Sequence, residues 1–181
     1  APNIIARPFN ISAEVDIPQG GAEGMLNTNG GRFGGYGFYL LKGRPVFVFN
    51  LLNLKRERWE GKDVLSPGKH TVEFDFQYEG AGLAAGISGI GKGGLGVIKV
   101  DGKEVANAHI EKTVPFVFQW DETFDVGADT GTPVDDKDYQ VPFNFTGKLN
   151  KLTIKLGPPK LSAEEEQLLH AMSRRNNRAS E

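Results

Sequence analysis

Residues 9–17 read Phe-Asn-Ile-Ser-Ala-Glu-Val-Asp-Ile, and this stretch decides the fold. Apolar and polar residues alternate along it without a break, which places every apolar side chain on one face of an extended chain. Pro18 and the pair Gly20-Gly21 follow directly and favour a turn. We therefore predict a half-buried β-strand over residues 9–17.

Similar apolar patterns recur along the chain, separated by turn residues. They fall at residues 36–40, 46–49, 71–76, 97–100, 105–106, 114–120 and 151–156. Asp101-Gly102 lies between two of these segments and suits a two-residue hairpin turn, because both residues tolerate positive φ. No helical stretch separates the segments, so a parallel α/β sheet is excluded. The pattern predicts an all-β fold, an antiparallel sandwich of two sheets.

The sequence after Pro158-Pro159 has a different character. Ser162 can cap a short C-terminal helix over residues 162–175, and Glu165 completes a capping box. The apolar stripe of this helix is thin. We expect a β-sandwich domain over residues 1–157, followed over residues 158–181 by a proline-led linker, the helix and a disordered tail.

Composition excludes several classes of function. The 181 residues have a net charge of −2, so there is no electrostatic argument for a nucleic acid or an anionic membrane as partner. The chain has no cysteine, which excludes disulfides, cysteine zinc sites and a cysteine nucleophile. No apolar run approaches the ~20 residues of a membrane-spanning helix.

The glycine-rich stretch 80–96 matches two nucleotide-binding patterns in part. Residues 86–92 fit GxxxxGK, and Gly91, Gly93 and Gly96 fit GxGxxG. Both motifs need a following helix whose N-terminus holds the phosphate. A strand pattern follows here instead, so we interpret the stretch as a flexible glycine-rich connection into a hairpin.

Residues 30–36, Gly-Gly-Arg-Phe-Gly-Gly-Tyr, present a cation and a ring on a flexible backbone. One interpretation is a recognition loop for an anion, a glycan or a neighbouring domain, using Arg32, Phe33 and Tyr36. The other is a turn in which Phe33 plugs the end of the sandwich and Arg32 binds carbonyl groups.

Trp59 and Trp120 are the candidates for stacking on a sugar, together with Tyr36 and Tyr39. Aromatic residues of β-sandwiches are also common core residues, because each buries a large apolar area. Both interpretations stay open from the sequence.

An acidic cluster lies within residues 121–138. Asp125, Asp129, Asp135 and Asp136 are tentative calcium ligands, since hard cations take oxygen ligands from such loops. The alternative is a solvated acidic loop. No pair of carboxylates is singled out for glycoside hydrolysis, and His70, His109 and His170 lack metal-ligand spacing. We therefore predict no catalytic residue in this chain.

An ordered series of segments resembles the C-terminal region of long bacterial arylsulfatases. The segments are residues 11–24, 30–36, 67–74, 100–106, 113–116 and 121–134. The resemblance spans residues 5–157, although the loop at residues 81–91 is longer than the family usually has. It implies a jelly roll of the concanavalin A-like kind, placed behind a sulfatase catalytic domain.

The resemblance also implies where the chemistry of the parent protein would lie. In that family, formylglycine and calcium belong to the preceding catalytic domain, and no serine here begins the S-x-P-x-R motif. We expect a non-catalytic accessory domain that packs against a sulfatase catalytic domain in a periplasmic or secreted bacterial protein. The alternative is a stand-alone carbohydrate-binding module with a glycan as its partner.

Overall fold

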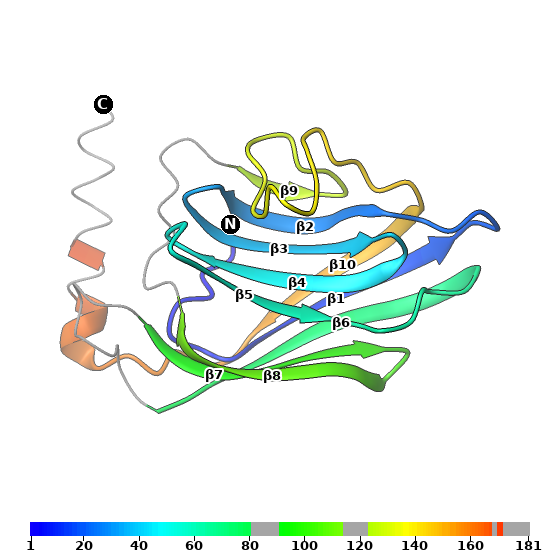
Figure 1. The fold of residues 1–181 in the computed structure, drawn as a ribbon. Helices are drawn as coiled ribbons and strands as arrows, with labels where there is room; N and C mark the ends of the chain where they lie inside the picture. Colours follow the sequence, from blue (N-terminus) through cyan, green and yellow to red (C-terminus); the bar gives the residue numbers. More distant parts are fainter. Residues whose placement is uncertain (81–90, 114–122, 168–169, 172–181) are drawn as a thin grey trace.

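Two antiparallel sheets stack on each other in the computed structural model, which describes residues 1–80, 91–113, 123–167 and 170–171 (Figure 1). Sheet A consists, in spatial order, of β10 (Lys148–Leu156), β1 (Phe9–Ile17), β6 (Gly68–Tyr78), β7 (Gly91–Val100) and β8 (Lys103–Thr113). Sheet B consists of β5 (Lys55–Glu60), β4 (Arg44–Leu51), β3 (Gly34–Leu41), β2 (Gly24–Gly31) and β9 (Phe124–Val126). The predicted all-β, two-sheet sandwich is confirmed.

The core lies between the two sheets and is rich in aromatic rings. All the apolar residues of the stretch 9–17 are buried in it, as the alternation predicts. Phe47 of β4 stacks on Phe74 of β6 with ring centroids 3.5 Å apart, so that a direct aromatic contact joins sheet B to sheet A. Such rings bury large apolar areas and supply much of the stabilisation of the core.

Three strands of sheet B, β2, β5 and the short β9, were not predicted from the sequence. In β2 the apolar and polar residues do not alternate, yet the whole strand is buried, including Asn27, Thr28 and Asn29. β5 is rich in charge and reads as surface. The expected turn at residues 30–36 is mostly strand, because β2 continues to Gly31 and β3 begins at Gly34. The strand predicted at residues 114–120 lies outside the described residues.

The glycines of residues 91–96 belong to a strand, which corrects the prediction of a flexible connection. They form the first half of β7, paired with β6 and β8. An added Cβ at Gly94 would lie 2.3 Å from the carbonyl oxygen of Gln77, so the close approach of these strands requires glycine there.

Residues 127–146, which we call the strap, cover the outer face of sheet B (Figure 1). Val134 and Tyr139 of the strap are buried against Tyr39 and Val48 on this face. The ring of Tyr139 also stacks on Phe143, with centroids 4.5 Å apart. The strap therefore closes this face of sheet B with a second, smaller apolar core.

The chain after β10 returns along the N-terminal segment. The backbone N–H of Gly157 donates to the Pro8 carbonyl, and that of Lys160 donates to the Ala6 carbonyl. A short helix covers residues 163–167, and its predicted capping box is present. Ser162 Oγ accepts from the Glu165 N–H at 3.2 Å, and Glu165 Oε2 accepts from the Ser162 N–H at 2.8 Å. Within the described residues, no helix has the length and apolar character of a membrane span.

Candidate ligand-binding groove

A polar groove lies on the outer face of sheet A, on the opposite side of the sandwich from the strap. It has a volume of about 410 Å³, within the range of small-ligand sites, ~300–1,000 Å³. Its lining comes from β1, β6, β10 and the β7–β8 turn: Glu14, Val15, Asp16, Lys69, His70, Thr71, Asp101, Lys148 and Asn150. We call this the sheet A groove.

Strand alternation and register place the charged side chains of the groove. Because the apolar residues of β1 face the core, Glu14 and Asp16 face outward. Asp16 lies opposite Lys69 of β6 on one side and opposite Lys148 of β10 on the other. β1 thus presents a carboxylate between two lysines, one from each neighbouring strand.

A β-bulge shapes one wall of the groove. Glu14 pairs with Lys151 but Val15 pairs with Leu149, so Asn150 is an extra residue of β10 without a partner in β1. A bulge of this kind re-aims side chains locally. It adds the Asn150 amide to the groove beside the Lys148 ammonium group.

Four polar side chains at the centre of the groove have no partner among the residues that the structure describes. In the described part of the chain, no hydrogen bond or ion pair engages the side chains of Asp16, Lys69, Lys148 or Asn150. Glu14 faces Lys151 at 3.9 Å, where both side chains are more than half exposed. These groups can therefore donate to and accept from a ligand without first breaking a protein contact.

His70, which lies opposite the core-facing Val15, links β6 to the β7–β8 turn at one end of the groove. Its Nδ1 lies 2.7 Å from Asp101 Oδ2, and its Nε2 lies 2.8 Å from the Ser66 carbonyl oxygen. Burial opposes the charge on His70, but the bonds to Asp101 and Ser66 outweigh it and raise the pKa of His70. Burial likewise opposes ionisation of Asp101, whereas the Thr71 N–H and His70 bring the pKa of Asp101 below its ordinary value.

The same three residues have the composition of a catalytic triad but not its arrangement. Ser66 Oγ lies 3.3 Å from His70 Nε2, farther than the carbonyl oxygen of the same serine. A carbonyl oxygen can only accept, so Nε2 must carry a hydrogen and cannot take one from the hydroxyl. These hydrogen bonds join β6 to the β7–β8 turn and to residue 66, and we call the bonded pair His70 and Asp101 the clip.

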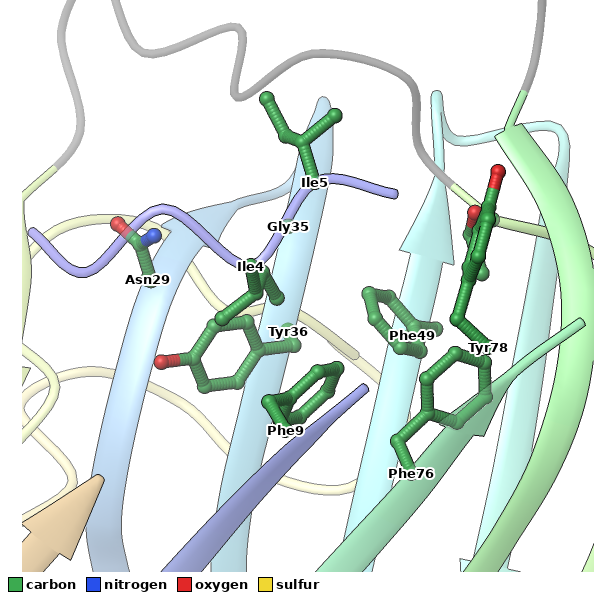
Figure 2. Close-up of a pocket in the computed structure, with 10 residues that line it drawn as sticks. Ile4, Ile5, Phe9, Asn29, Gly35, Tyr36, Phe49, Phe76 and Tyr78 are labelled. Atoms are coloured by element: carbon green, nitrogen blue, oxygen red, sulfur yellow. The ribbon is translucent and has the colours of Figure 1, made fainter. Parts of the chain in front are cut away.

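A second hollow lies at the opposite end of the sandwich and is apolar. Figure 2 shows Phe9, Tyr36, Phe49 and Phe76 gathered below Ile4. Its volume is about 20 Å³, room for about one water molecule. This hollow belongs to the packing of the core and is too small for a sugar.

A third hollow of about 470 Å³ runs between the edge strands β5 and β8. Its polar groups are largely engaged with one another. Arg58 pairs with Glu60 at 3.0 Å, and the Asn107 amide donates to Glu104. Because these groups already have partners, this hollow offers a ligand less than the sheet A groove does.

The structure separates the three residues of the predicted recognition loop. Phe33 is 68% exposed at the tip of the β2–β3 turn, so it does not plug the sandwich end. Arg32 pairs with Asp136 of the strap at 3.5 Å rather than with carbonyl groups. Tyr36 is buried, its hydroxyl donates to Asn27 Oδ1, and burial raises the pKa of Tyr36.

Trp59 is placed in the core and not on a sugar-binding surface. Its side chain is 2% exposed, and its Nε1 donates to the Ala108 carbonyl at 3.0 Å. Neither face of the ring is open to a sugar, which corrects the stacking interpretation for this residue. Tyr39 is likewise buried, and Trp120 lies outside the described residues.

The four tentative calcium ligands act separately. Asp125 accepts from the backbone and hydroxyl of Thr130, and Asp129 Oδ2 accepts from the Tyr139 hydroxyl at 2.5 Å. Asp135 accepts from the Lys137 N–H at 3.1 Å, and Asp136 pairs with Arg32 and Arg56. Across the described ranges, no three acidic or histidine side chains gather as metal ligands. The predicted calcium site is not assembled, because local turns and arginines occupy these carboxylates.

Comparison with known proteins supports the fold and no closer relationship. No family model and no curated protein matches the sequence. The CBM40 of the Ruminococcus gnavus IT-sialidase, solved with α2,6 sialyllactose, superposes with a TM-score of 0.55 at 12% identity, over 89% of this chain and 82% of that one. The same CBM40 with α2,3 sialyllactose gives a TM-score of 0.54 at 13% identity, over 89% and 80%.

Mouse laminin α1 domains LG4-5 superpose with a TM-score of 0.52 at 13% identity, over 88% of this chain but only 38% of the laminin chain. At such identities the likeness shows the fold alone. The chain has the concanavalin-like jelly-roll sandwich that the resemblance to sulfatases implied, and none of these matches is a sulfatase.

Sequence reasoning did not single out the residues of the sheet A groove. Glu14, Asp16 and Lys69 read as the ordinary polar side of alternating strands. The polar face of residues 9–17 is the sequence signal that could have identified Glu14 and Asp16. Which residues of the neighbouring strands lie beside them depends on the strand register, which the alternation does not specify.

Proposed function

We propose that this chain is a glycan-binding module and that the sheet A groove is its ligand site. The observation that carries the proposal is a set of polar groups at the groove's centre to which the described residues supply no partner: Asp16 between Lys69 and Lys148, with Asn150 from the bulge of β10. Sugars offer hydroxyl groups that both donate and accept, so such a mixed set is complementary to them. The sialyllactose-bound CBM40 structures, which share this fold, support a carbohydrate ligand.

The groove binds without sugar-stacking rings in this proposal. Among the described residues no Phe, Tyr or Trp lines it, so affinity comes from hydrogen bonds to charged groups, each worth about 1.5–3 kcal/mol. A few such bonds, offset by desolvation and lost freedom, give the weak affinity expected of an open polar site. Avidity on a multivalent glycan surface would strengthen it.

The test is a glycan array followed by calorimetry with the best-bound glycan. Lys148→Ala and Asn150→Ala should each weaken binding about tenfold, the equivalent of ~1.4 kcal/mol. Lys155→Ala is the matched control, because Lys155 is an exposed lysine of the same strand outside the groove. Equal affinity in all three variants would rule out the groove as the site.

A second candidate function is the accessory domain of an arylsulfatase-like hydrolase. The ordered sequence resemblance over residues 5–157 suggests it, and Phe33 and Leu54 favour it as exposed apolar contacts, 68% and 84% exposed. Both lie on turns at the same end of sheet B, since the β3 residue Gly34 lies beside Leu52 of the β4–β5 turn. In this case the parent protein would hydrolyse sulfate esters and this chain would pack against its catalytic domain.

Co-expression with a separate sulfatase catalytic domain tests this second candidate. Complex formation, followed by sedimentation, should be lost in the double variant Phe33→Ser, Leu54→Ser and kept in Val64→Ser, an exposed apolar control elsewhere. A formylglycine motif encoded upstream in the same gene would support the candidate independently.

A further inference from the structure

The charges of the sheet A groove do not favour an anionic ligand. The lining contains three carboxylates, those of Glu14, Asp16 and Asp101, together with two lysines and His70, and no arginine is among the described residues that line it. Recognition of a sugar carboxylate is best served by a planar, bidentate guanidinium group. Here a carboxylate brought between the two lysines would meet Asp16, and the like charges would repel each other.

The free hydrogen-bonding groups of the groove match adjacent hydroxyls instead. Asp101 is engaged by the Thr71 N–H at 2.8 Å and by His70. Asp16 is therefore the carboxylate at the centre of the groove for which the described residues supply no hydrogen-bond donor. The register puts a lysine donor on each side of it. One sugar hydroxyl can donate to Asp16 while its own oxygen accepts from a lysine, and a neighbouring hydroxyl can repeat the pattern.

We infer that the sheet A groove recognises a neutral sugar through adjacent hydroxyls held by Asp16, Lys69 and Lys148, and not the carboxylate of an acidic sugar. This inference rests on the proposed glycan-binding function. It gives the site a ligand class different from that of the sialyllactose-bound CBM40 structures with the same fold.

The experiment compares glycans that differ only in their terminal acidic sugar. The full chain is titrated at pH 7 with an array of neutral oligosaccharides, lactose among them, and with the sialylated form of each. Backbone amide shifts in an NMR spectrum report which residues are affected. We expect neutral glycans to shift the amides of Asp16, Thr71 and Asn150, and the sialylated forms to bind no more tightly than their neutral cores.

Two variants make the test specific. Asp16→Asn removes the charged acceptor with little change of shape and should weaken neutral binding at least tenfold. Asp63→Asn, at an exposed acid outside the groove, should leave it unchanged. An unfolded variant would show in its own NMR spectrum, and Lys69→Ala then serves as the second variant, with the same loss expected.

The possible failures are distinguishable. Sialylated glycans that bind in the groove more tightly than their neutral cores, with loss of binding in Lys69→Ala, would overturn the inference and leave the glycan-binding function standing. An array without any bound glycan, or shifts confined to residues outside the groove, would overturn both.

Discussion

The indole of Trp59 lies directly against Gly96, so that a methyl group added at Gly96 would come within 2.5 Å of the ring carbon Cε2. Trp59 belongs to β5 of sheet B and Gly96 to β7 of sheet A, and the contact explains a glycine in the middle of a strand. The ring also donates its N–H to the Ala108 carbonyl of β8. This tryptophan therefore joins the edges of the two sheets.

Gly96→Ala should destabilise the protein, because the added methyl must displace the packed indole. We expect a loss of ~1–3 kcal/mol in the free energy of unfolding, measured by urea denaturation. Gly20→Ala is the control, since an added Cβ there meets no atom within 4 Å, and its effect should stay within ~0.5 kcal/mol. An unchanged midpoint for Gly96→Ala would contradict the packing described.

The clip between His70 and Asp101 predicts a dependence of stability on pH. The pKa of His70 is raised in the folded state, so its contribution is fully present below its unfolded pKa, about 6.5, and is lost as the pH rises through the folded value. The pKa of Asp101 is lowered, so its contribution is present above its unfolded pKa, about 3.8, and is lost as the pH falls through the folded value. Both contributions to stability are therefore present between about pH 3.8 and about pH 6.5.

We therefore expect His70→Gln to cost most stability near pH 5 and progressively less as the pH rises above about 6.5. Thermal unfolding at a series of pH values measures this. The control is His109→Gln, which removes a half-exposed histidine paired with a half-exposed Glu79. A His70→Gln deficit that is constant from pH 5 to pH 9 would show that the ring is not held as a cation.

Within the strap, the Tyr139 hydroxyl donates a buried hydrogen bond to Asp129. Asp129 is 1% exposed, and the Tyr139 hydroxyl also accepts from the Val134 N–H at 2.9 Å. Tyr139→Phe removes the hydroxyl that bonds to the Asp129 carboxylate and to the Val134 N–H. We expect this to lower the free energy of unfolding by ~1–3 kcal/mol. Hydrogen exchange at the Val134 amide should rise in the variant, whereas the exposed change Gln140→Ala should have little effect. Unchanged exchange and stability in Tyr139→Phe would count against the strap as described.

The strands of the sandwich could be predicted where one face of the strand is exposed to solvent and the other is buried in the core. Residues 9–17 and 71–76 show this alternation and are found as β1 and part of β6. The alternation fails for β2, because the strap buries its outer face and Asn27 and Asn29 are themselves buried. A strand that is buried on both faces has no solvent-exposed polar positions, so its sequence does not alternate between apolar and polar residues.

The site was less predictable than the fold, since it depends on which strands become neighbours. Arg32 and Trp59 were selected as candidates because of their residue types. In the structure Arg32 forms an ion pair with Asp136 of the strap, and Trp59 is buried in the core. The groove depends instead on β10 lying beside β1, an association between the two ends of the sandwich sequence. The bulge that adds Asn150 leaves no local mark in the sequence.

The most direct measurement of the central claim compares Lys148→Ala with Lys155→Ala in calorimetric titrations with the glycan that binds best on the array. The account predicts that Lys148→Ala weakens binding about tenfold and that Lys155→Ala binds like the parent chain, because only Lys148 lines the groove. Identical affinities in the two variants, or the same loss in both, would contradict the sheet A groove as the ligand site.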